Sequence, residues 1–428
     1  MQQGYSRDTA GIQQGCSRIK VSQAISIIMI QLISRGSIMP DIDCRDLDSR
    51  DIDSRDIGSG DKKDNIMILC NSLGGFYDFR GEVAQALLKR YNVVICAPDD
   101  VHIKELADAG CHVRKTPINR RGMNPFQDIK LYRQYRQLLK EYRPKTVLTY
   151  TIKPNIYGGE ACRKMHIPYI TNITGLGTSF ERGGAVQKLV TEMYKSTLKD
   201  ADCVFFQNNY NRDVLEKAGI HWKKDIVLPG SGVNLEKHSV MPYPVKGACE
   251  FLFVGRVMKE KGIEEFLYSA EKYHSDQVKF GIVGYCEEEY GDRLKKLNDQ
   301  GIVNFYGFST DMPKYYEEAG AVVVPSYHEG MSNVLLEASA SGRPVIASDI
   351  SGCREAVDDK VTGILCRPRD NESLADAVKY MIGKTTEERA RMGQNARKKM
   401  EREFDRNRVI DRYMNEIEKA GGKENGSV

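Results

Sequence analysis

The chain has 428 residues, of which 41% are hydrophobic and 29% are charged, and its formal net charge is +4. This length allows two domains with a sizeable core, and no segment has the roughly 18 consecutive apolar residues of a membrane span. The 11 cysteines are scattered without CxxC pairs or His/Cys clusters at metal-ligand spacing. We therefore expect buried thiols in a reducing cytosol and no metal site.

Residues 1–63 differ from the rest in composition. They contain the repetitive stretch "CRDLDSRDIDSRDIGSGDKK", and their nine acidic and nine basic residues cancel. Because such a segment buries too little apolar surface to offset its ordering entropy, we expect a disordered low-complexity extension. Two alternatives are an artefactual upstream start, with Met39 as another initiator, and a secretory signal around "AISIIMIQLI" (24–33), although no small-residue cleavage site follows.

From residue 65 onward, short apolar runs alternate with longer helical stretches. The first series is "NIMILC" (65–70), "NVVICAP" (92–98), "TVLTYT" (146–151), "PYITNIT" (168–174) and "CVFFQN" (203–208). The second series is "CEFLFVG" (249–255), "KFGIVG" (279–284), "VNFYG" (303–307), "AVVVPS" (321–326), "PVIASD" (344–349) and "GILCRP" (363–368). Runs that are apolar at every position indicate strands covered on both faces, and strand–helix alternation indicates parallel sheets.

These two series predict an α/β protein with two doubly wound, Rossmann-like domains that face a central cleft. We place the first domain at 64–235 and the second at 236–403. A last helix at 404–420, with apolar residues Val409, Tyr413 and Ile417, is expected to return to the first domain. In open α/β sheets ligands bind beyond the carboxyl ends of the strands, so functional residues are expected there.

The stretch "HEGMSNVLLEASASGRP" (328–344) follows one of these strand ends. Ser332 is a fair helix N-cap, so the backbone N–H groups near Met331 to Val334 are available for an anion. Asn333 and Glu337 are four residues apart on one helix face, where a carboxylate can accept bonds from a ribose diol. Glu329 in the preceding loop can reach a second polyol. The alternative is that Glu337 is an ordinary surface residue.

Two cations follow the first strand of the second series. Arg256 and Lys261 in "FVGRVMKEKG" are predicted at the carboxyl end of the same sheet. A guanidinium and an ammonium suit a diphosphate. They could also be simple surface charges, but the helix dipole disfavours cations at a helix start.

Several of these segments resemble a known family. "VGRVMKEKG", "VNFYGFSTDMPKYYEEA" and "VVVPSYHEGMSNVLLEASASGRPVIASDISGCREAV" resemble the carboxyl-terminal domain of retaining glycosyltransferases of family four, which have the GT-B fold. In the first domain, "YTIKPNIYGGEACRKMHIPYITNITGLG" resembles bacterial members that add a sugar to a polyprenyl-diphosphate-linked saccharide. The resemblance runs from about 249 to 370 and continues through 64–235, and only residues 1–63 lie outside it.

The resemblance implies roles for individual residues. Glu329 would meet the transferred sugar, and Arg256 and Lys261 would neutralise the donor diphosphate during catalysis. The other donor-binding residues implied are Gly74, Gly75, Met331, Ser332, Asn333, Glu337 and Phe308. No cofactor and no metal ion are expected besides the UDP-sugar co-substrate, because the cations and the helix start do the work of a metal.

The resemblance also implies the course of the reaction. The acceptor hydroxyl would attack the sugar on the face that the diphosphate leaves, and a phosphate oxygen would take the proton. Glu329 would therefore position the sugar without forming a covalent intermediate. Many relatives carry a histidine after the fourth strand, whereas this chain has Thr174.

The expected acceptor side is rich in positive charge, with ten Lys/Arg and two Asp/Glu between 111 and 145. The basic residues predicted on one helix face are Arg133, Arg136, Lys140 and Arg143, and a neighbouring stripe consists of Leu131, Tyr135, Leu138 and Tyr142. A basic amphipathic helix suits an anionic membrane surface, but it could also be the solvated face of a packed helix. No motif accompanies it that would indicate nucleic acid.

Lys153 and Asn155 in "YTIKPN", together with Thr174, are expected to bind the acceptor, with Lys153 on its diphosphate. The sequence thus predicts a cytoplasmic enzyme at the inner face of the cell membrane. It would move a hexose or N-acetylhexosamine from a UDP-sugar to a lipid-linked saccharide in surface glycan biosynthesis. The alternatives are a nucleotide-sugar epimerase or glycoside phosphorylase on a similar frame, and a non-catalytic nucleotide-sugar binder.

Overall fold

The computed structural model describes residues 63–119, 124–176, 184–245, 247–286 and 289–421. Nearly all of the extension predicted at 1–63 lies outside the described residues. The chain divides into two compact units. Unit 1 contains the described residues up to Val204, with 215–225 and those from Glu416 onward, and unit 2 contains 205–214 and 226–415.

Unit 1 is built around a seven-stranded sheet in the order β3-β2-β1-β4-β5-β6-β7, whose last two strands, β6 and β7, continue into residues assigned to unit 2. Neighbouring strands from β3 through β5 pair in parallel. The strands are β1 (Asn65–Leu69), β2 (Asn92–Ala97), β3 (His112–Lys115), β4 (Thr146–Tyr150), β5 (Tyr169–Ile173), β6 (Cys203–Phe206) and β7 (Asp225–Val227).

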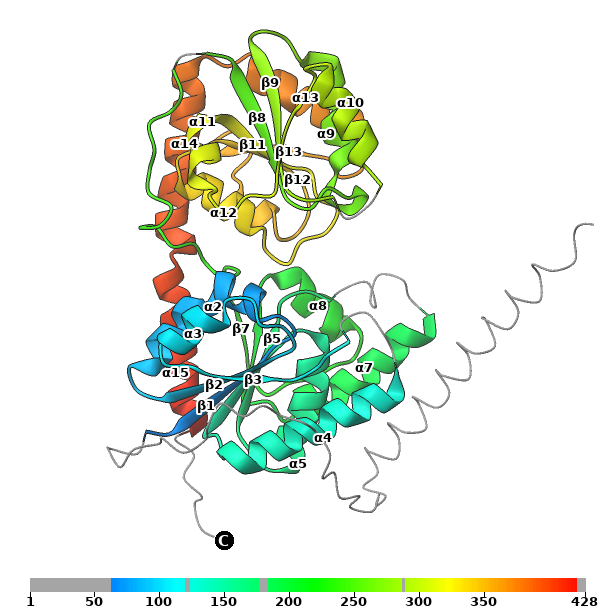
Figure 1. Cartoon of the computed structure of the whole chain (residues 1–428), viewed down its shortest axis with the longest axis vertical. Coiled ribbons are helices and arrows are strands. Elements are labelled where there is room, and N and C mark those ends of the chain that lie inside the picture. Colours follow the sequence, from blue (N-terminus) through cyan, green and yellow to red (C-terminus); the bar gives the residue numbers. More distant parts are fainter. Residues whose placement is uncertain (1–62, 120–123, 177–183, 246, 287–288, 422–428) are drawn as a thin grey trace, which may run out of the picture. The chain divides into compact units, whose positions relative to one another are not determined.

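Helices cover both faces of this sheet. Because crossovers between parallel strands are right-handed, the reversal of strand order at β1 and β4 places α2 and α3 on one face and α4, α5 and α7 on the other (Figure 1). The helical segments are α2 (Leu73–Leu88), α3 (Ile103–Asp108), α4 (Pro125–Tyr142), η1 (Pro154–Gly158), α5 (Gly159–Lys164), α7 (Gly184–Leu198) and α8 (Asn209–Lys217).

Unit 2 repeats this plan with a six-stranded parallel sheet in the order β10-β9-β8-β11-β12-β13. Its strands are β8 (Cys249–Val254), β9 (Val278–Val283), β10 (Asn304–Gly307), β11 (Ala319–Val324), β12 (Val345–Ser348) and β13 (Gly363–Cys366). These two parallel-sheet units confirm the predicted fold class.

The helices of unit 2 also form two layers (Figure 1). One face carries α9 (Ile263–Tyr273), α10 (Gly291–Asp299) and α13 (Asn371–Ile382), with η2 (Lys259–Lys261) ahead of α9. The other face carries α11 (Pro313–Glu318) and α12 (Asn333–Ala340), with α14 (Thr386–Lys399) beside α12. The remaining segments are η3 (Arg354–Ala356), η4 (Met400–Phe404) and α15 (Arg406–Gly421).

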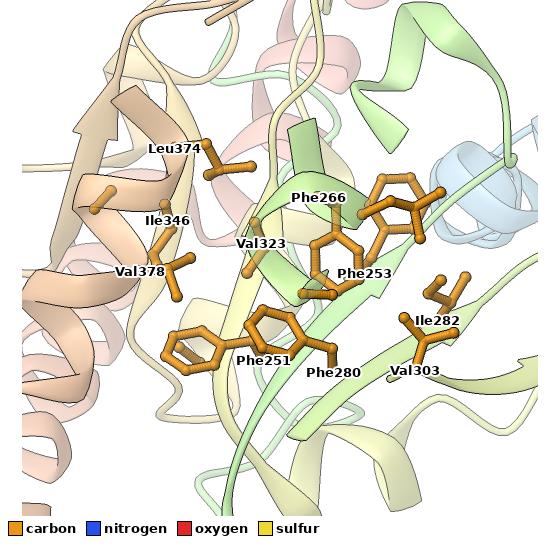
Figure 2. Packing of buried hydrophobic residues seen from close by; sticks show 14 of the residues in the cluster. Phe251, Phe253, Phe266, Phe280, Ile282, Val303, Val323, Ile346, Leu374 and Val378 are labelled. Carbon is orange, nitrogen blue, oxygen red and sulfur yellow. The ribbon is translucent and has the colours of Figure 1, made fainter. Parts of the chain in front are cut away.

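A cluster of aromatic side chains fills the core between the unit 2 sheet and α9 (Figure 2). The rings of Phe251 and Phe280 stack with centroids 5.4 Å apart, and Phe266 meets Phe280 edge-on at 5.6 Å. Leu374 and Val378 of α13 extend this cluster. Aromatic pairs of this kind add about 0.5–1.5 kcal/mol beyond their area burial, so the sheet gives the loops at its carboxyl end a rigid base.

Helix α15 carries its apolar residues at the predicted positions. Val409, Tyr413 and Ile417 are fully buried. Near its end, Glu416 forms an ion pair with Lys224 at 2.5 Å, within unit 1. The helix therefore begins among the residues of unit 2 and ends among those of unit 1.

Candidate active site

The carboxyl ends of β8 and β11 hold three of the residues singled out from the sequence. The two strands are parallel neighbours, so the loops that follow them leave the sheet side by side. Arg256 lies just after β8, Lys261 lies in η2, and Glu329 lies in the loop after β11. The Lys261 ammonium is 2.6 Å from Glu329 Oε1, and the two side chains are 24% and 15% exposed. The structure thus places the predicted diphosphate cation directly beside the predicted sugar-binding carboxylate.

The backbone fixes these two loops against each other. The Tyr327 N–H donates to the Glu260 carbonyl at 2.9 Å. Gly262 has φ +75°, and a Cβ there would lie 2.1 Å from the Pro325 carbonyl oxygen. Because any side chain at this position would force the loops apart, the spacing between Lys261 and Glu329 depends on this glycine.

The start of α12 provides backbone donors near Glu329. Ser332 is the N-cap, as predicted, and its hydroxyl accepts from the Leu335 N–H. The Ser332 N–H itself donates to the Gly352 carbonyl at 2.9 Å. Since the first-turn N–H groups have no intrahelical partner, those of Asn333 and Val334 remain for an anion. The sequence alone suggests the wider set of N–H groups from Met331 to Val334.

Gly352 holds this arrangement in place. It has φ +88°, and a Cβ would lie 2.6 Å from the Glu329 carbonyl oxygen. Its N–H donates to Glu355 Oε2 at 2.7 Å. The turn around Gly352 therefore supports both the Glu329 loop and the start of α12.

Asn333 and Glu337 are held by partners from other parts of unit 2. The Ser231 hydroxyl donates to Asn333 Oδ1 at 2.5 Å, and the Tyr316 hydroxyl donates to Glu337 Oε2 at 3.0 Å. Burial, together with the charge of Glu337, raises the pKa of Tyr316 well above its ordinary value, so the phenol stays protonated and donates. Glu337 is thus a half-buried, oriented carboxylate, which argues against the simple surface residue considered above.

Two exposed aromatic side chains follow β9 and β10. Phe308 is 68% exposed and Tyr285 is 46% exposed. Their rings meet edge-on with centroids 6.1 Å apart. Tyr306 instead turns back along the sheet, where its hydroxyl donates to Glu250 at 2.7 Å. Phe308 is therefore more exposed than Tyr306, which is 40% exposed.

Gly74 and Gly75 lie in the first turn of α2, in unit 1. The N–H groups of Leu73 and Gly74 donate to Asp99 Oδ1 at 3.0 and 3.2 Å, and the Gly75 N–H donates to the Ser72 hydroxyl at 3.1 Å. Because these donors are already satisfied, a ligand that binds these N–H groups would have to replace an existing hydrogen bond. The predicted donor contact of Gly74 and Gly75 stays a prediction.

The three predicted acceptor residues lie beyond the carboxyl ends of β4 and β5. Lys153 forms a largely buried ion pair with Asp128 of α4 at 2.6 Å. Asn155 is buried, and its amide donates to the Asn172 carbonyl at 2.9 Å, which joins the ends of the two strands. Thr174 directly follows β5 and is half-buried. Their contact with an acceptor stays a prediction.

Helix α4 has a basic outer face, which consists of Arg133, Arg136, Lys140 and Arg143, all exposed. Arg143 lies just past the helix end, in the left-handed conformation with φ +43°. The neighbouring stripe is not available to a membrane, because Leu131, Tyr135 and Leu138 pack into the core of unit 1. Phe126 at the helix start is 70% exposed. The helix is therefore a packed helix with a basic surface, and only Phe126 adds a large exposed apolar group.

Other expectations concern metals, membranes and thiols. Within the described ranges, no three His, Cys, Asp or Glu side chains are grouped so that they could hold a metal ion. None of the described helices is both long and apolar enough to cross a bilayer. Most of the described cysteines are buried and none is in a disulfide. Burial raises the pKa of the Cys203 thiol to about 12, so it is inert as a nucleophile.

The sequence did not single out the residues that orient this site. Tyr316, Ser231 and Gly352 act on Glu337, Asn333 and the Glu329 loop from segments distant in sequence. Tyr316 lies in "VNFYGFSTDMPKYYEEA", which carries part of the family resemblance, but nothing in the local pattern distinguishes it from Tyr315. Conservation of Tyr316 among related chains would have been the signal that distinguishes it.

Comparison with protein families gives two matches. Residues 69–208 match the family "Glycosyl transferase 4-like", and residues 244–399 match "Glycosyl transferases group 1". Together these matches cover most of the chain and correspond closely to the two sheets.

Two curated relatives align over most of their length. The chain is 26% identical to the N,N'-diacetylbacillosaminyl-diphospho-undecaprenol alpha-1,3-N-acetylgalactosaminyltransferase of Campylobacter jejuni, over 82% of this chain and 97% of that protein. It is 24% identical to the capsular polysaccharide biosynthesis glycosyltransferase CapM of Staphylococcus aureus, over 76% of this chain and 89% of that protein.

Solved structures share the fold. Anabaena HepE, in complex with UDP-glucose, superimposes with a TM-score of 0.68 at 20% identity, covering 82% of this chain and 99% of that one. A glycosyltransferase from Rickettsia africae superimposes with a TM-score of 0.69 at 19% identity, covering 85% and 100%. The predicted GT-B fold is confirmed by these likenesses. With a 4-like domain followed by a group 1 domain, the chain belongs to the glycosyltransferases.

Proposed function

We propose that this glycosyltransferase moves a hexose or N-acetylhexosamine from a UDP-sugar to a saccharide carried on a polyprenyl diphosphate, with retention of configuration and without a metal ion. The observation that carries the donor half is the grouping at the carboxyl end of the unit 2 sheet. Lys261 and Glu329 are in contact there, and Arg256 and the start of α12 lie on the same pair of loops.

These groups match the charges that develop during sugar transfer. The bond between the anomeric carbon and the diphosphate oxygen breaks, so negative charge grows on the leaving phosphate. Arg256, Lys261 and the N–H groups of Asn333 and Val334 at the start of α12 would stabilise that charge. Glu337, oriented by Tyr316, would accept hydrogen bonds from the ribose hydroxyls.

The acceptor hydroxyl forms the new bond to the anomeric carbon on the face that the leaving group vacates. Its proton passes to an oxygen of the departing phosphate, so the chain need not supply a base. Glu329 orients the transferred sugar. Its carboxylate is paired with Lys261, so we infer that donor binding shifts Lys261 from Glu329 toward the diphosphate.

The lipid-linked acceptor is supported by the relatives. The Campylobacter relative is named for an undecaprenol-diphosphate-linked acceptor, and CapM is named for capsular polysaccharide biosynthesis. We propose that the basic outer face of α4 and Phe126 bring the enzyme to the anionic inner surface of the cell membrane. The acceptor would be presented there.

The test is a set of incubations with individual UDP-sugars, with and without lipid extract that contains polyprenyl-diphosphate-linked saccharides. UDP release that requires the lipid acceptor, unchanged by EDTA, supports the proposal. Retention is tested by NMR of the new anomeric centre. Interconversion of the UDP-sugar without acceptor would indicate an epimerase. Formation of a sugar 1-phosphate from a glycan and phosphate would indicate a phosphorylase. Tight UDP-sugar binding without turnover would indicate a binding protein.

A further inference from the structure

Arg80 of α2 is a buried arginine without an acidic partner. The residue is only 5% exposed. One Nη donates to the Phe79 carbonyl at 2.9 Å, and the guanidinium carbon lies 6.0 Å from the centre of the Tyr150 ring. Its Nε has no hydrogen-bond partner. Among the described residues, no carboxylate forms an ion pair with Arg80.

Other arginines show what a purely structural role looks like in this fold. In unit 1, Arg163 donates two hydrogen bonds to Glu160, at 2.9 and 2.7 Å. In unit 2, the fully buried Arg343 donates to three backbone carbonyls, and only its Nη1 has no partner. Arg80 has neither arrangement. Because a buried charge is normally paired or fully hydrogen-bonded, its surroundings indicate an anion that binds from outside the chain.

Arg80 lies where ligands bind in this class of fold. Phe76, one turn earlier on α2, meets the Tyr150 ring edge-on with centroids 5.8 Å apart. Tyr150 is the last residue of β4, which pairs with β1. This contact brings the same face of α2 to the carboxyl edge of the sheet, at the point where the strand order reverses.

The next residue, Thr151, supplies a second and independent indication. Its backbone has φ +73°, which is rare for a β-branched residue. Its hydroxyl is buried and has no hydrogen-bond partner. Strained backbone conformations in native proteins cluster at active sites and ligand sites, and a buried polar atom without a partner needs an explanation such as a bound ion. An unpaired hydroxyl therefore lies one residue beyond the tyrosine whose ring is 6.0 Å from the Arg80 guanidinium carbon.

We propose that Arg80 and Thr151 bind a phosphate of the diphosphate that links the acceptor saccharide to its lipid. The inference rests on the proposed function for the identity of the ligand, but the anion site itself does not. The guanidinium offers planar donors to phosphate oxygens, and the Thr151 hydroxyl donates to the same group. Lys153, two residues later, is ion-paired with Asp128, so Arg80 is the cation better placed to receive a new anion.

Binding is tested first with inorganic pyrophosphate as the probe. The full chain is saturated with UDP to occupy the donor site, and pyrophosphate is then titrated while the melting temperature is recorded. We expect a rise in melting temperature for the wild type and for the Arg163→Met control, and no rise for Arg80→Met. No rise in the wild type, or an equal rise in Arg80→Met, would overturn the proposal.

The stability of the unliganded variants gives a separate readout. Since Arg80 has no acidic partner, Arg80→Met should melt at or above the wild-type temperature, whereas Arg163→Met, which leaves Glu160 unpaired, should melt lower. A marked loss of stability in Arg80→Met would mean that the guanidinium is structural. Arg80→Lys keeps the charge and should retain part of the pyrophosphate response.

Kinetics then identify the ligand. Arg80→Met should raise the KM for the lipid-linked acceptor at least tenfold and change the KM for the UDP-sugar less than twofold. Equal effects on both constants would overturn the assignment to the acceptor. If the wild type transfers no sugar to any diphosphate-linked lipid while the pyrophosphate response still depends on Arg80, the proposed function fails and the anion site stands.

Discussion

The ion pair between Lys261 and Glu329 allows a prediction that separates a catalytic cation from a structural one. If the Lys261 ammonium lies about 3 Å from a phosphate oxygen, and the effective dielectric constant is near 20, the two unit charges attract each other by about 5 kcal/mol. Arg256 and the start of α12 compensate part of this, so the loss should resemble the removal of one preorganised donor, about 3 kcal/mol. The Lys261→Met substitution should therefore lower kcat on the order of 100-fold.

Stability should respond differently from activity. Lys261→Met leaves the Glu329 carboxylate without its partner, and that side chain is only 15% exposed. The free energy of unfolding should fall by about 1–2 kcal/mol. The double variant Lys261→Met/Glu329→Gln removes the unpaired charge, so it should regain most of this stability. It should not regain activity, because the diphosphate still lacks its ammonium group.

The assay combines urea unfolding with UDP release under saturating donor and acceptor. Glu329→Gln alone is the matched control: it frees Lys261, so UDP should bind several times more tightly while kcat falls. If the double variant recovers both stability and turnover, or if Lys261→Met retains full turnover, then the pair is structural and the reasoning fails.

Three further predictions follow from other contacts. Tyr316→Phe removes the hydrogen bond to Glu337 and should raise the KM for the UDP-sugar about fivefold, in line with about 1 kcal/mol for one hydrogen bond; an unchanged KM would refute the ribose assignment. Burial raises the pKa of Glu250, so its ionised form lowers stability at neutral pH, and this effect disappears as the pH falls through the raised pKa. Glu250→Gln should accordingly melt higher than the wild type at pH 7.5 but not near pH 4, and an equal difference at both pH values would contradict this. Reversal of two charges on the basic outer face of α4 (Arg136→Glu with Lys140→Glu) should abolish binding to vesicles that contain anionic lipid while leaving UDP affinity unchanged; undiminished vesicle binding would exclude this face as the membrane contact.

The strands of both sheets were largely predictable, because a strand buried on both faces must be apolar at every position. All eleven runs singled out in the sequence correspond to strands of the structure. The strands missed, β3 and β7, are short, and β3 is the edge strand "HVRK", which carries charged residues and is only partly buried. An edge strand needs no continuous apolar run, so its pairing with β2 is set by tertiary structure.

The site was predictable where residues close in sequence act together, and where the pairing of β8 with β11 brings the loops of Lys261 and Glu329 side by side. Ser332, Asn333 and Glu337 share one helix, and its N-cap could be identified from residue type alone. The contact of Tyr316 with Glu337 and the close approach of Gly352 to the Glu329 loop join distant segments. The environment of α4 was also not predictable from local sequence, because an apolar stripe has the same periodicity whether it faces a membrane or a core. In the structure this stripe faces the core.

The most direct test of the donor assignment is a crystal structure of the full chain with an intact UDP-sugar. We expect the distal phosphate to accept hydrogen bonds from Arg256, Lys261 and the N–H groups of Asn333 and Val334, and the ribose hydroxyls to donate to Glu337. A diphosphate bound away from these groups would contradict it.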